Sequence, residues 1–264
     1  MTDRPYTTQL QAGLGMIEET QTLLDLWQEG MTPSELEQVT LATGQFPNVS
    51  ARRLRNIVAE CFAPRYLRDA AAPARHLKQL RPVLKRVEFE QLLFLYTCRA
   101  TTIFYDFVRD VYWPAYAAGR NTITYDDARD FVTRANQEGK TTRPWSESTI
   151  KRVAGYLNGV CADFGLLERT SKPIRRILSY RLEPYVALIM AHNLHAAGLG
   201  DNLVLAHSDW ELFGLARLDV LDELRRLARQ DWLIVQVAGN VIRIEWHYKD
   251  MEALANAIAA RQLR

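Results

Sequence analysis

The sequence predicts a mainly α-helical globular protein with two or more helix-turn-helix elements, the C-terminal ones winged by short β-hairpins. Apolar residues recur at helical spacing through most of the chain. Residues that start and stop helices punctuate these segments. Short runs of strand-forming residues follow two of the C-terminal helices. The 264 residues suffice for two modest domains, which we place at 1–118 and 119–264.

The N-terminal region predicts two helices. Residues 7–30 form one amphipathic segment that Gly30 ends. The second helix starts after Thr32, which forms a capping box with Glu35, and it stops at Gly44. The apolar stripe of the first helix consists of Leu10, Leu14, Ile17, Leu23, Leu24 and Trp27.

The segment that follows predicts the second helix of a helix-turn-helix. The letters "FPN" at 46–48 make the turn, and Ser50 or Asn48 caps the helix. Its buried face is formed by Leu54, Ile57, Val58, Cys61 and Phe62. Its exposed early residues are Arg52, Arg53, Arg55 and Asn56. In this motif, such positions contact DNA, and the free N–H groups of the helix start favour phosphate.

Residues 81–119 predict the buried scaffold that carries this motif. The segment is helical in period and rich in aromatic residues. An aromatic stripe at this spacing is more typical of a core than of a platform for stacked bases.

A second helix-turn-helix is predicted further along the chain. Residues 123–139 form its first helix, with Ala128, Phe131, Val132 and Ala135 on the inner face. Ser146 or Ser148 caps the next helix, which buries Ile150, Val153, Leu157, Cys161 and Phe164. Ser148, Lys151 and Arg152 share a different face. Two cations in the first turns oppose the helix dipole, so we expect an anionic partner there.

Two strand-like runs, Leu166–Thr170 and Ile177–Leu182, follow this helix. The basic turn between them predicts a wing whose tip carries Lys172, Arg175 and Arg176. We expect these three residues to contact the DNA backbone or minor groove.

A third segment, residues 207–248, repeats the pattern. A helix, a turn at Gly214 and a second helix precede a hairpin turned by Gly239 and Asn240. The second helix is expected to bury Leu218, Leu221, Leu224 and Leu227. Because this helix starts with acidic residues, we interpret the segment as structural or partner-binding.

Charge is distributed unevenly along the chain. The net charge is only +2. Residues 45–86 nevertheless hold ten basic and two acidic residues, and residues 134–181 hold ten and four. Each basic block overlaps one predicted helix-turn-helix, and a local basic patch is typical of a polyanion binder.

No motif of an enzyme or cofactor site occurs. The sequence lacks a Walker A loop, a dinucleotide-binding glycine motif, a nucleophile elbow and a zinc-protease motif. His192 and His195 stand three apart but have no third ligand at a suitable spacing. We therefore expect no catalysis, no cofactor and no metal. The three cysteines form no disulfide framework, and no signal peptide or membrane span is visible, so we expect a cytoplasmic protein.

Several segments in order resemble the BrxA family of BREX (bacteriophage exclusion) phage-defence systems. They include "GLGMIEETQTLLDLW", "FPNVSARRLRNIVAECFAPRYL", "DFVRDVYWPAY", "WSESTIKRVAGYLNG", "ADFGLLE" and "GLGDN". The resemblance covers nearly the whole chain. It implies a small, helical, monomeric DNA-binding protein with two helix-turn-helix elements beside a positive surface. We map these elements onto Ser50–Phe62 and Trp145–Phe164.

Three functions are compatible with this pattern. The first is a non-enzymatic double-stranded DNA binder that works with other BREX proteins. Arg and Lys would contact phosphates, and Asn56 and Ser148 could contact bases. The second is a protein-interaction adaptor that assembles defence components. The third is an RNA-binding helical protein that uses the same charges.

Overall fold

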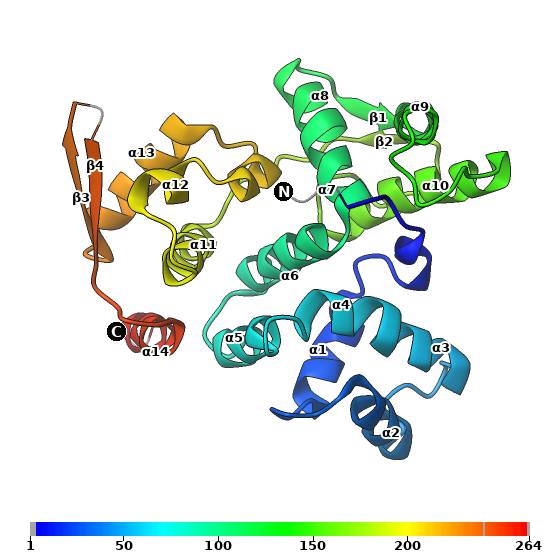
Figure 1. The fold of residues 1–264 in the computed structure, drawn as a ribbon, viewed down its shortest axis with the longest axis horizontal. Coiled ribbons are helices and arrows are strands. Elements are labelled where there is room, and N and C mark those ends of the chain that lie inside the picture. Colours follow the sequence, from blue (N-terminus) through cyan, green and yellow to red (C-terminus); the bar gives the residue numbers. More distant parts are fainter. Residues whose placement is uncertain (1–3, 240, 263–264) are drawn as a thin grey trace. The chain divides into compact units, whose positions relative to one another are not determined.

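The computed structural model describes residues 4–239 and 241–262. Within them the protein is mainly helical, with two small antiparallel sheets of two strands each, which confirms the predicted fold class (Figure 1). Within these ranges, no helix is long and apolar enough to cross a membrane.

The chain divides into two compact units that differ from the predicted domains. The first comprises Met1–Arg75 and Leu93–Tyr180, and the second comprises His76–Leu92 and Arg181–Arg264. The boundary predicted at 118 and 119 lies inside the first unit, so each unit is built from two stretches of chain.

The first unit begins with a series of short helices. The prediction of one helix over residues 7–30 is wrong. A 3₁₀ turn is followed by an extended loop, and the α-helix starts only at Ile17. Gly13 is extended and Met16 is left-handed, with a φ of 50°, so the two segments cannot join into one helix. The elements are η1 (Gln9–Ala12), α1 (Ile17–Leu26), α2 (Pro33–Thr43), α3 (Ala51–Asn56), η2 (Ile57–Phe62) and α4 (Ala63–Tyr66). The helix α5 (Ala72–Leu80) begins in this unit and belongs to the second unit from His76 on.

The aromatic scaffold is buried, as predicted. It consists of α6 (Arg86–Ala100), α7 (Thr102–Phe107), η3 (Val108–Tyr112) and α8 (Trp113–Ala117). In the first unit, the Phe94 ring lies 5.6 Å from that of Phe164, at the end of the second predicted motif. Tyr66 and Tyr96, 6.3 Å apart, join the first motif to the same scaffold. The core therefore carries both basic helices.

The rest of the first unit contains β1 (Thr122–Thr124), α9 (Tyr125–Gln137), α10 (Glu147–Asp163) and β2 (Ile174–Arg176). The two strands pair antiparallel, with Ile123 opposite Arg175. Leu167 forms a further bridge to Ile177. Cys61, Cys98 and Cys161 are all buried free thiols.

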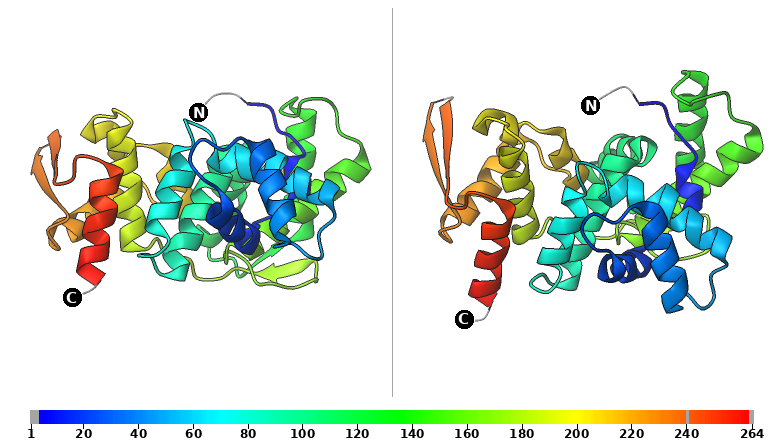
Figure 2. Two further views of the ribbon diagram at one scale, coloured as in Figure 1. Left: turned by 90° about the horizontal axis from the view of Figure 1, so that it is seen from below. Right: turned by 60° about the horizontal axis from the view of Figure 1, so that its bottom comes forward.

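The second unit contains the third predicted segment. After the last part of α5 and the first part of α6 come α11 (Pro184–Ala196), α12 (Asp201–Leu205), η4 (Ser208–Phe213), α13 (Arg217–Ala228), β3 (Leu233–Ala238), β4 (Val241–Trp246) and α14 (Met251–Gln262). The hairpin and α14 are the orange and red elements of Figure 2. The turn at Gly214 is confirmed, and Gly239 ends β3, but Asn240 lies outside the described residues.

One predicted core position of this unit is wrong. Leu218 is 75% exposed, whereas Leu221, Leu224 and Leu227 are buried. Helical spacing explains the difference, because Val220 takes the inner position in the first turn and turns Leu218 outward.

The same unit buries a histidine whose protonation should weaken the fold. His192 is packed among the rings of His195, Trp246 and Tyr248. Burial lowers the pKa of His192 below its ordinary value. The negative charge of Asp250 raises this pKa, but this effect is smaller than that of burial. The unfolded chain then binds the proton more readily than the folded chain. We expect the free energy of unfolding to fall as the pH drops below about 6.5.

Urea denaturation between pH 7.5 and 5 measures this effect. The His192→Gln variant should show a flatter dependence on pH than the wild type. His247→Gln, at an exposed position, serves as the control. An unchanged slope in His192→Gln would assign the pH dependence to other groups.

Candidate nucleic-acid interface

The first basic helix is built by the capping residues that the sequence predicts. In α2, the Glu35 N–H donates to Thr32 Oγ1 at 3.2 Å, and Gly44 ends the helix in the left-handed region. The next helix starts at Ser50, whose Oγ accepts from the Arg53 N–H at 3.2 Å. Its predicted inner residues are all buried. The helix continues without interruption from α3 through the π-helical turn η2 into α4.

The polar residues of α3 differ in how the fold uses them. Arg52 and Arg53 are exposed and form no ion pair among the described residues. Arg55 Nε lies 3.1 Å from Glu37 Oε1 of α2, so this residue ties the two helices together. Asn56 is half-buried. Arg52 and Arg53 are therefore the freest cations of this helix.

A further arginine of the same helix has a structural role that the charge count does not indicate. Arg65 is only 5% exposed. Its guanidinium donates to the carbonyl oxygens of Gly13 at 3.0 Å, Leu14 at 2.8 Å and Gly15 at 3.4 Å. The sequence contains a signal for this burial, because Arg65 stands four residues after Cys61 and so continues the helical spacing of the buried stripe.

The loop of residues 13–15 is also held by the second basic helix. The Gly15 N–H donates to Asp163 Oδ2 of α10 at 2.9 Å. A Cβ on Gly15 would stand 2.6 Å from the Asp163 Cβ, so only glycine fits. The adjoining η1 contacts both η2 and α10. One loop thus fixes both basic helices in the same unit.

The second basic helix, α10, presents the predicted polar face. Ser146 is the N-cap, and its Oγ accepts from the Thr149 N–H. Ser148, Lys151 and Arg152 are all exposed. Lys151 Nζ lies 3.6 Å from Glu147 Oε1, an exposed i,i+4 pair worth about 0.5 kcal/mol at most. So weak a pair leaves Lys151 available to a phosphate.

The segment after α10 corrects the predicted wing. β2 begins directly after Pro173 and contains Arg175 and Arg176, so these two residues lie in a paired strand and not at a tip. A proline lacks the N–H of a strand interior, which explains why pairing starts at Ile174. Lys172 is exposed in the connection before the strand. Of the residues predicted at the tip, Lys172 alone lies there.

The helix α13 of the second unit is electrostatically different. Its Arg225 pairs with Asp222 at 3.1 Å and its Arg226 with Glu223 at 2.9 Å. These basic charges are balanced by carboxylates of the same helix. In α3 and α10, by contrast, Arg52, Arg53 and Arg152 have no such partner among the residues that the structure describes.

The described residues thus form a mainly helical protein in which two helices, each preceded by a helix and a turn, carry exposed basic residues in their early turns. The sequence profile of the BrxA family matches residues 4–193. The chain belongs to the BrxA family, whose members are components of BREX defence systems. The match ends within α11, so α13 and the β3–β4 hairpin lie outside it.

Comparison with solved structures supports the fold. The crystal structure of an uncharacterized protein from Magnetospirillum magneticum aligns with a TM-score of 0.56 and 17% sequence identity, covering 72% of this chain and 94% of that chain. At this identity the likeness concerns the fold alone. No curated protein matches the chain.

Proposed function

We propose that this protein is a non-enzymatic double-stranded DNA-binding component of a BREX system, and that the exposed faces of α3 and α10 contact the duplex. The observation that carries the proposal is the presence of cations that the fold does not use. Arg52, Arg53 and Arg152 are exposed and without ion pairs among the described residues, and Lys151 has only a weak one.

The arrangement of these residues fits a helix-turn-helix protein. They lie in the first turns of the second helix of each motif, where the motif places its DNA contacts. Lys172 and Arg176 add exposed charge beside α10, and Arg175 is half-buried there. Most contacts would be to phosphates, with Asn56 and Ser148 as the candidates for base contacts.

Fluorescence anisotropy with a labelled duplex over a salt series tests the proposal. If about five phosphates are neutralised, log K should fall with log salt at a slope of roughly −4.5. Structured RNA should compete less well than unlabelled duplex DNA. Absence of duplex binding at low salt would refute the proposal, and stronger competition by RNA would favour an RNA-binding protein.

A second candidate function, a protein-interaction adaptor, is favoured by the surface of the second unit. Leu203 on α12 is 63% exposed, and Leu218 is exposed at the acidic start of α13. A contiguous apolar patch rimmed by polar residues marks a site of protein contact. The Arg217 guanidinium donates to Asn202 Oδ1 at 2.8 Å, which joins the helix starts that carry the two leucines. Pairwise binding between this protein and purified BREX components, in the presence of nuclease, would support an adaptor. Substitution of Leu218 by Ser should then weaken that binding while duplex binding stays unchanged.

A further inference from the structure

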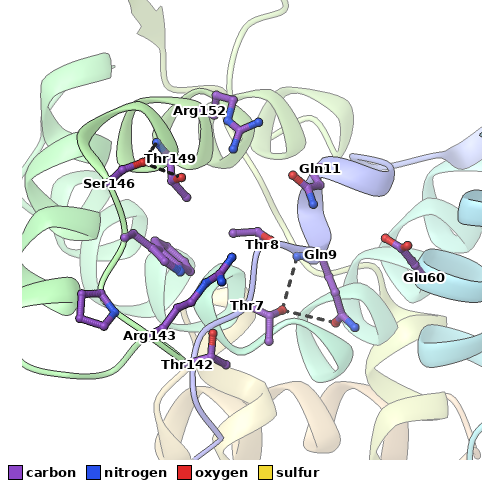
Figure 3. Close-up of a pocket in the computed structure, with 12 residues that line it drawn as sticks. Thr7, Thr8, Gln9, Gln11, Glu60, Thr142, Arg143, Ser146, Thr149 and Arg152 are labelled. Atoms are coloured by element: carbon purple, nitrogen blue, oxygen red, sulfur yellow. Dashed lines mark hydrogen bonds between the residues drawn. The ribbon is translucent and has the colours of Figure 1, made fainter.

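The first unit contains a pocket of about 660 Å³ beside the start of α10. One wall is formed by residues 142–146 together with Thr149 and Arg152, and the opposite wall by residues of the segment 7–11 and by Glu60 of η2. Figure 3 shows the guanidinium ends of Arg143 and Arg152 directed into the space between α10 and this segment.

The first wall is rich in hydrogen-bond donors without partners. Arg143 and Arg152 form no ion pair or side-chain hydrogen bond among the residues that the structure describes. Trp145 is only 8% exposed and lines the pocket, yet within the same residues its indole N–H donates to nothing. The indole nitrogen itself is open to solvent, so its N–H can donate to a bound ligand. These three side chains together favour an anion, and two guanidinium groups suit a phosphate.

The opposite wall has another character. Gln9 and Gln11 supply amides, and Glu60 supplies the carboxylate of the pocket. Amide and carboxylate groups are the side chains that hydrogen-bond to the edges of nucleobases. The pocket is also larger than a phosphate ion needs and within the range of small-molecule sites. Two arginines against one glutamate match a ligand with a single phosphate group better than a triphosphate.

We propose that this pocket binds one nucleotide, with its phosphate at Arg143 and Arg152 and its base toward Gln11 and Glu60. The nucleotide is either free or an unpaired nucleotide of a DNA strand. Binding of a nucleotide in this pocket does not depend on whether α3 binds a duplex. Because Arg152 belongs to both surfaces, a free nucleotide should compete with duplex DNA for α10.

Isothermal titration of the full chain tests the free form. The probes are the four deoxynucleoside monophosphates, the matching deoxynucleosides and inorganic phosphate. At least one monophosphate should bind, and its deoxynucleoside and inorganic phosphate should each bind at least about tenfold more weakly. Equal binding of inorganic phosphate would overturn the assignment to a nucleotide.

Variants locate the binding site. Arg143→Gln should lower the affinity for the monophosphate about tenfold. Trp145→Phe keeps the ring and removes the N–H, and it should also weaken binding. Arg134→Gln changes an exposed arginine of α9 outside the pocket and should have no effect. Equal affinities in all three variants would overturn the site, provided that circular dichroism shows each one folded.

A second arm tests the unpaired nucleotide. A duplex with a one-nucleotide bulge should bind more tightly than the fully paired duplex, and Arg143→Gln should remove that advantage. If no monophosphate binds and the bulge gives no advantage, the pocket proposal fails. Binding of the paired duplex is measured in the same series. If the wild-type protein does not bind the paired duplex, the proposed function is refuted. Failure of the pocket proposal and failure of the proposed function are therefore distinguishable.

Discussion

Replacing Lys151 and Arg152 by glutamate should weaken duplex DNA binding by at least about a hundredfold at ~0.1 M salt. Both wild-type side chains are exposed, and in the proposed interface each would donate a charge-assisted hydrogen bond to a phosphate, worth about 1.5–3 kcal/mol. Glutamate would replace that attraction with repulsion. Loss of two phosphate contacts should also flatten the salt dependence, changing the slope by about 1.8.

Anisotropy across the salt series measures both effects, with circular dichroism as the check on folding. The matched control is Arg225→Glu with Arg226→Glu, two adjacent arginines of α13 that pair with carboxylates. This control changes the net charge by the same amount in the second unit. An equal loss of affinity in both double variants would mean that the overall charge governs binding, and that the face of α10 has no special role.

The second large effect is expected at Arg65. Arg65→Met should lower the free energy of unfolding by about 3 kcal/mol, because it leaves the buried carbonyl groups of the 13–15 loop without their donor. Methionine retains much of the aliphatic volume, so the effect reports chiefly the hydrogen bonds. DNA affinity should fall as well, because this loop fixes α10 relative to the α3–α4 helix.

The midpoint of urea denaturation measures the first effect. Arg68→Met is the control, since Arg68 is an exposed arginine just beyond the same helix. This substitution should change the free energy of unfolding by about 0.5 kcal/mol or less. Equal midpoints for Arg65→Met and the wild type would show that water or backbone movement satisfies the loop carbonyls.

Local signals in the sequence predict most of the helices correctly. Thr32, Ser50 and Ser146 all serve as N-caps, and the apolar stripes of α3, α9 and α10 are buried. These features depend on neighbours within a few residues. The failure at residues 7–30 has the opposite cause. Periodicity alone favours a helix there, but long-range contacts from Arg65 and Asp163 hold the glycine loop extended.

The candidate site could also be predicted only where it depends on local sequence. Exposure of Arg52, Arg53, Lys151 and Arg152 follows from helical spacing, which the sequence reveals. The wing tip was misplaced because strand pairing depends on β1, some fifty residues upstream of β2. Arg143 and Trp145 were not predicted as site residues, since their pocket exists only where residues 7–11 and Glu60 come together.

The division into units has a consequence for how the protein can be cut. The chain passes between the two units after Arg75, after Leu92 and after Tyr180. A fragment that ends at residue 118 would lack α9 and α10 and would still carry a strip of the second unit. No single cleavage yields either unit whole. We expect limited proteolysis to produce fragments that stay associated until denatured, and deletion analysis of this protein to give unfolded products more often than separated activities.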